Sequence, residues 1–189
     1  MMLGNEPSIT QSQFAEIAIA SCSDRPAAMV FTGYFERQVL ARCGLHALNN
    51  AIGYEFLSAP LLHLACQEYI EEMHREGVAE DRAVHERATG WYSEVVLAFG
   101  LRMHQNIYRL DLDNPIRCNL ENSAERIYNP EVLGVIVNQD QGHWTTFKYL
   151  GDCIWFIDSD AAAPVAKSFG QFRNYIEFYL HAFAVVSIA

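Results

Sequence analysis

The sequence predicts an α+β fold, a helical half followed by a central antiparallel sheet. Between residues 43 and 99, apolar residues recur at intervals of three and four, which is typical of amphipathic helices. Beyond residue 102, short runs of β-branched and aromatic residues alternate with turn residues instead. The chain has 189 residues, 51% of them hydrophobic, which is enough to bury one core. Helices followed by strands indicate an α+β rather than an α/β arrangement.

The first 32 residues differ from the rest of the chain. Asn5 to Ser8 is turn-like, Phe14 to Ala20 fits one or two helical turns, and Ser21 to Pro26 interrupts that pattern. We interpret residues 1–32 as an N-terminal extension, either loosely docked or ordered by a partner. Residues 33–189 then form the main domain.

Three helices are expected in the first half of this domain. Apolar spacing predicts one over 43–52, a second over 59–76, and a third over 91–99 that ends at Gly100. The charged stretch 77–90 is expected to be a connection between the second and third helices.

The second half is expected to contain strands and one further helix. Gly151 and Asp152 form a hairpin signal between two of the strands. The predicted strands cover 102–108, 133–138, 143–150, 153–158 and 183–188, and the predicted helix covers 168–181.

Charge and cysteine usage limit the class of protein. A formal net charge of -10 argues against nucleic acid or an anionic membrane as a partner, because both need clusters of Lys and Arg. We expect a monomer in a reducing compartment, the cytoplasm, with the nucleus or the cytosol of a host cell also compatible. No signal peptide or membrane span is recognisable. The five cysteines, an odd number without a CxxC pair, are Cys22, Cys43, Cys66, Cys118 and Cys153.

Three residues suggest nucleophilic catalysis. Cys43 stands where a helix should begin, and a helix N-terminus stabilises a thiolate. His143 and Asp158 lie near the open end of the predicted hairpin, where a carboxylate could orient an imidazole base. Two alternatives remain open from spacing alone: Asp160 in place of Asp158, and His46, one helical turn after Cys43, in place of His143. No HxH or HExxH pattern suggests a metal, and no cofactor is expected.

Four ordered blocks carry a resemblance to a known family. Glu36-Arg37-Gln38 with Cys43-Gly44-Leu45-His46-Ala47-Leu48-Asn49-Asn50 resembles the signature of the Josephin family of deubiquitinating cysteine proteases. The stretches Gly90 to Ser93, Gly142 to Trp144 and Trp155 to Ser159 are similar to its later blocks.

The resemblance implies a papain-like fold and a catalytic domain that spans residues 33–189. Cys43 would be the nucleophile, His143 the base, Asp158 its orienting carboxylate, and Gln38 a donor to the oxyanion. The implied partner is ubiquitin or a ubiquitin conjugate, cleaved at the isopeptide or ester bond of its C-terminal glycine. Phe35, where the family often has His, and residues 72–90 depart from the pattern.

Two other functions fit the same residues. The chain could be a papain-like hydrolase of another ubiquitin-like modifier or of a small amide. It could also be a ubiquitin-binding module that has lost its chemistry. The complete set of Cys43, His143, Asp158 and Gln38 favours an active hydrolase over the binding module.

Overall fold

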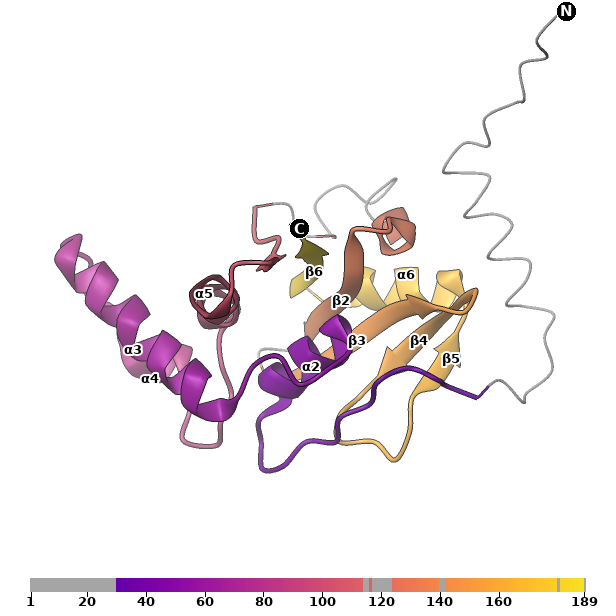
Figure 1. Ribbon diagram of the computed structural model, residues 1–189, viewed down its shortest axis with the longest axis horizontal. Helices are drawn as coiled ribbons and strands as arrows, with labels where there is room; N and C mark the ends of the chain where they lie inside the picture. The colour runs from indigo at the N-terminus through magenta and orange to yellow at the C-terminus, as the bar shows by residue number, and fades with distance from the viewer. Residues whose placement is uncertain (1–29, 114–115, 117–123, 140–141, 180, 189) are drawn as a thin grey trace, which may run out of the picture.

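The computed structural model describes residues 30–113, 116, 124–139, 142–179 and 181–188, which form an α+β fold (Figure 1). An N-terminal helical part is followed by a six-stranded antiparallel sheet, as the sequence predicts. Cys22, Cys118 and nearly all of the predicted extension lie outside the described residues. Its boundary at residue 33 therefore stays a prediction. Within the described part, no helix combines the length and the apolar character needed to cross a membrane.

The first two helices lie where their apolar spacing places them. Helix α2 covers Cys43–Ile52 and is buried along its whole length, and α3 covers Ala59–Arg75 with only one buried face. Gly53 ends α2 in the left-handed conformation with φ 105°, which glycine adopts without strain. The charged connection contains a short helix that the sequence did not indicate, α4 at Arg82–His85, whose first turn is capped by Asp81.

The predicted end of the third helix is wrong. Helix α5 covers Glu94–His104, so Gly100 lies inside it and the strand expected over 102–108 begins only at Tyr108. Packing explains the difference, because a Cβ on Gly100 would come within 2.7 Å of Leu62 Cδ2 on α3. Gly100 is therefore a point of close helix contact rather than a helix stop.

The sheet has the strand order β1-β6-β2-β3-β4-β5. The strands predicted around β2, β3, β4 and β6 are confirmed, although β6 starts at His181 because α6 already ends at Phe178. The sequence missed β5 and the 3₁₀-helix η1 (Ala124–Tyr128). The strands are β1 at Tyr108–Leu110, β2 at Val132–Gln139, β3 at His143–Leu150, β4 at Cys153–Ile157, β5 at Val165–Lys167 and β6 at His181–Ser187, and α6 covers Phe169–Phe178.

The hairpin between β3 and β4 sets the geometry of the site. Its two turn residues, Gly151 with φ 60° and Asp152 with φ 63°, both adopt the left-handed conformation that suits a two-residue turn between twisted strands. The turn fixes a register in which Thr146 pairs with Ile157 and Leu150 with Cys153. The open end of this hairpin carries His143 and Asp158.

Two layers of helix enclose the sheet. Helices α2 and α5 pack on one face around Trp144, Leu97 and Phe183, whereas α6 and η1 pack on the other around Phe147 and Phe172 (Figure 1). Helices α3 and α4 extend beyond the sheet, where α3 packs on α5 and α4 packs on α3 (Figure 1). Helix α2 is therefore held between the sheet and the other helices.

Candidate active site

Cys43 is the first residue of α2, as predicted, and only 3% of its surface is exposed. The residue before it, Arg42, makes no side-chain cap, and the first helical hydrogen bond runs from the His46 N–H to the Arg42 carbonyl. The N–H groups of the first turn consequently have no acceptor within the helix. An uncapped N-terminus forgoes roughly 1 kcal/mol of stability and leaves the Cys43 N–H free to donate to a bound anion.

Two side chains of β3 attach α2 to the strand that carries His143. Thr146 Oγ1 donates to the Ala47 carbonyl at 2.8 Å, and Lys148 Nζ donates to the Ala51 carbonyl at 2.6 Å. Lys148 is partly buried, and this burial lowers its pKa to about 8. These bonds fix the position of Cys43 relative to the start of β3.

His143 and Asp158 meet at the open end of the hairpin. The Nε2–H of His143 donates to Asp158 Oδ1 at 2.9 Å. Asp160 does not compete for the imidazole, because it is exposed and its own backbone N–H donates to the same Asp158 oxygen at 2.9 Å. Of the two carboxylates that spacing left open, Asp158 is the one that contacts His143.

The imidazole of His143 is poised as an acid at neutral pH. Its hydrogen bond with the Cys43 side chain is the largest cause that raises its pKa from 6.5 to about 9. Burial works in the opposite direction, while the hydrogen bond and charge of Asp158 raise the pKa further. Because Nε2 is used by Asp158, Nδ1 is the ring nitrogen left to serve the sulfur. A protonated imidazole beside a thiol favours the thiolate.

Gln38 is held by a residue that sequence reasoning did not identify, Ser159. The Gln38 backbone N–H donates to the Ser159 carbonyl at 2.9 Å, and Ser159 Oγ donates to Gln38 Oε1 at 3.1 Å. With Oε1 so used, the Nε2 amide of Gln38 has no acceptor among the described residues and can donate to a substrate oxyanion. Ser159 is 2% exposed and directly follows Asp158, so one turn supports both.

His46 is committed to structure and is not available as a base. Its Nδ1–H donates to Glu36 Oε1 at 2.6 Å, and its Nε2 accepts from the Val39 N–H at 3.2 Å. A backbone N–H can only donate, so the Nε2 lone pair is occupied and the proton resides on Nδ1. Burial opposes ionisation of Glu36, but the hydrogen bond from His46 lowers the pKa of that carboxyl.

The two asparagines after His46 hold neighbouring backbone, as their place in the helix suggests. Asn50 Oδ1 accepts from the Glu36 N–H at 2.7 Å, and Asn50 Nδ2 donates to the Glu36 carbonyl at 3.1 Å. Asn49 does the same for the segment after α2, with hydrogen bonds to Phe56 and Leu57. One face of α2 therefore fixes the segment that leads to Gln38.

A second histidine forms a chain of polar contacts that the sequence did not reveal. His85 Nδ1 lies 2.9 Å from Ser93 Oγ, and His85 Nε2 lies 3.1 Å from Glu80 Oε2. His85 is the last residue of α4 and is only 6% exposed. Ser93 and His85 are both buried, so this chain ties α4 to the start of α5 rather than facing a substrate.

Trp144 and two of the remaining cysteines are buried. Trp144 is fully buried, and its Nε1–H donates to the Tyr92 carbonyl at 2.9 Å. Cys66 and Cys153 lie in the core. Among the described residues, no group of three or more His, Cys, Asp or Glu side chains is arranged to hold a metal ion.

Comparison with known proteins does not place the chain in a family. No family model matches the sequence, and no curated protein matches it at a significant level. The function of the chain is therefore inferred from the geometry around Cys43.

Proposed function

We propose that this protein is a deubiquitinase of the Josephin type, a cysteine hydrolase with a papain-like site. The observation that carries the proposal is the pairing of His143 with Asp158 at 2.9 Å, in a site where His143 also bonds to Cys43 at the start of α2. Nucleophile, acid and orienting carboxylate thus act on one another within a single site. Gln38, with its amide nitrogen uncommitted and its carbonyl held by Ser159, adds an oxyanion donor.

The proposed reaction has two steps. The Cys43 thiolate attacks the carbonyl carbon of the C-terminal glycine of ubiquitin, and the Cys43 N–H and the Gln38 amide hold the resulting oxyanion. The imidazolium of His143 gives its proton to the departing amine or alcohol, which leaves a thioester on Cys43. His143 then takes a proton from water, which attacks the thioester and releases ubiquitin with a free carboxylate. Asp158 keeps the imidazole oriented throughout.

The test is a ubiquitin probe with a cysteine-reactive group at its C-terminus, applied to the wild type, Cys43→Ala and His143→Ala. We expect a covalent adduct on the wild type, none on Cys43→Ala, and slow formation on His143→Ala. Asp160→Asn serves as the matched control and is expected to react like the wild type. Alkylation of Cys43 by iodoacetamide without any reaction with the ubiquitin probe would discard ubiquitin as the substrate. Failure of both reagents would discard the hydrolase.

A further inference from the structure

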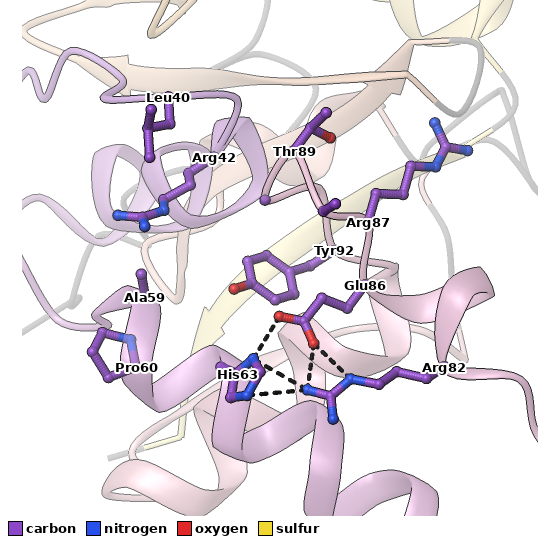
Figure 2. A pocket seen from close by; sticks show the side chains of 12 residues that line it. Leu40, Arg42, Ala59, Pro60, His63, Arg82, Glu86, Arg87, Thr89 and Tyr92 are labelled. Atoms are coloured by element: carbon purple, nitrogen blue, oxygen red, sulfur yellow. Dashed lines mark hydrogen bonds and ion pairs between the residues drawn. The ribbon is translucent and has the colours of Figure 1, made fainter.

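A hollow of about 740 Å³ lies beside the nucleophile, between the segment before α2 and the helices α3 and α4 (Figure 2). Arg42 and Leu40 line it from the segment before Cys43, Pro60 from α3, and Glu86, Gly90 and Tyr92 from the connection to α5. Cys43 does not line the hollow itself, but its neighbour Arg42 does. We refer to this hollow as the Arg42 pocket.

The charge of the Arg42 pocket is opposite to that of the whole chain. Three arginines line it, Arg42, Arg82 and Arg87, against a single carboxylate, Glu86, in a protein with a formal net charge of -10. Glu86 is already neutralised, because Arg82 Nε donates to Glu86 Oε2 at 2.9 Å and His63 Nδ1 lies 2.8 Å from Glu86 Oε1 (Figure 2). Arg87 is also engaged, over the ring of Trp91.

Arg42 is the uncommitted cation of the pocket. Its guanidinium forms no hydrogen bond or ion pair with any residue in the described part of the chain. Its aliphatic stem is fixed instead, because it packs against Gly90, whose φ is 92° and where a Cβ would come within 2.7 Å of Arg42 Cγ. The stem is thus positioned while the charged end remains available.

The hydroxyl of Tyr92 faces the same space. Tyr92 is only 3% exposed, yet its hydroxyl has no hydrogen-bond partner among the described residues. Figure 2 shows this hydroxyl pointing toward the middle of the pocket, between Arg42 and the pair of His63 and Glu86. Burial, followed by the charge of Glu86, raises the pKa of Tyr92 to about 12, so the group remains an O–H donor. The hydroxyl is therefore a donor that a ligand in the pocket can use.

We propose that the Arg42 pocket is a substrate subsite that binds the carboxylate of an acidic side chain, with Arg42 and the Tyr92 hydroxyl as its donors. A guanidinium and one hydroxyl match the two oxygens of a carboxylate. Pro60 and Leu40 provide apolar walls for the methylene groups of a glutamate. A phosphate dianion fits less well, because Arg42 and the Tyr92 hydroxyl are too few donors for its three oxygens and second charge. The inference rests on the proposed function in one respect: the ligand is taken to be part of the substrate of Cys43.

Binding is tested without catalysis, on the full chain carrying Cys43→Ala. The probes are the peptide amides acetyl-Ala-Glu-Ala and acetyl-Ala-Gln-Ala, followed by the backbone amide resonances of Leu40, Gly90 and Tyr92. We expect the glutamate peptide to bind about fivefold or more tightly than the glutamine peptide. Arg42→Gln should abolish this preference and Tyr92→Phe should reduce it. Arg109→Gln, an exposed arginine on β1, should leave it unchanged.

Two outcomes would overturn the subsite. Equal binding of the two peptides would show that the pocket does not recognise a carboxylate. Tighter binding of a phosphoserine peptide would show that its ligand is a phosphate.

A hydrolysis assay separates this proposal from the proposed function. The substrates are two conjugates in which ubiquitin is joined to the lysine of a short peptide, with Glu or Gln beside that lysine. They report both the hydrolysis and the preference for Glu over Gln. Peptide binding without hydrolysis of either conjugate would leave the subsite standing and refute the deubiquitinase. Hydrolysis of the conjugates without a preference for the glutamate peptide would support the deubiquitinase and refute the subsite.

Discussion

The imidazole of His46 joins Glu36 to the backbone N–H of Val39, so a histidine one turn after Cys43 holds the loop that carries Gln38. The loop needs this support because Leu40, the residue after Val39, has a φ of 62°, which is strained for a side chain that is not glycine. Val39 and Leu40 are both more than half exposed and receive little support from packing. His46 is therefore a positioning residue for the predicted oxyanion donor.

Substitution His46→Phe should impair turnover without removing the nucleophile. Loss of both hydrogen bonds frees the Gln38 loop, and misplacement by about 1 Å costs on the order of 100-fold in kcat/KM. Cys43 and His143 keep their own contact, so iodoacetamide should still alkylate Cys43 at close to the wild-type rate. His74→Phe, on the exposed end of α3, is the matched control. Equal losses of alkylation and hydrolysis would mean that His46 supports the whole fold and not the loop.

Gln38 and Ser159 should differ in the size of their effects. Gln38→Ala removes an oxyanion donor and should lower kcat by about 100- to 1,000-fold. Ser159→Ala leaves the amide in place but removes the hydroxyl that orients it, so we expect a loss of roughly 10-fold. Steady-state kinetics on a fluorogenic ubiquitin substrate measures both, and the double variant should resemble Gln38→Ala. If the losses in kcat of the two single variants were fully additive in the double variant, Ser159 would not act through Gln38.

Asp158→Asn should lower the pKa of His143, because the hydrogen bond and charge of Asp158 both raise it. In the wild type the imidazolium needed as an acid is lost above pH 9, so kcat/KM should fall there. In the variant this alkaline limb should move to lower pH. Titration of the His143 ring by NMR gives the pKa directly, and an unchanged value would refute the electrostatic role of Asp158.

The same shift has a consequence for stability. The pKa of His143 is higher in the folded protein, about 9, than the ordinary value of 6.5. Its protonation therefore contributes its full stabilisation of the fold below pH 6.5, and this contribution is lost as the pH rises through about 9.

Lys148 should show the opposite dependence on pH. Its folded pKa, lowered from 10.5 to about 8, means that the unfolded chain binds more protons between these values. The contribution of Lys148 to stability therefore rises with pH from about 8 to 10.5. We expect the difference in Tm between the wild type and Lys148→Met to shift in favour of the wild type across this range. Lys167→Met on the edge strand β5 is the control, and a difference that does not depend on pH would contradict the burial of the ammonium.

Local sequence patterns determined much of the fold. Apolar spacing determined α2 and α3, and Gly151 with Asp152 determined the hairpin of β3 and β4, because each depends on interactions within a few residues. The same hairpin was sufficient to bring His143 near Asp158. The prediction that Gly100 ends a helix was wrong because this position needs a glycine for another reason. That reason is its contact with Leu62, which lies 38 positions away in the chain.

Only the tertiary structure decided how the site is assembled. Neither the choice of Asp158 over Asp160 nor the commitment of His46 to Glu36 and Val39 follows from spacing, because side-chain direction depends on the strand ends and on packing. Ser159 lies 121 positions from Gln38, and Thr146 lies 99 positions from Ala47. Contacts of such separation form only when the helical half packs on the sheet. The sequence therefore supplied the reactive groups, and the packing of α2 against β3 determined which of them meet.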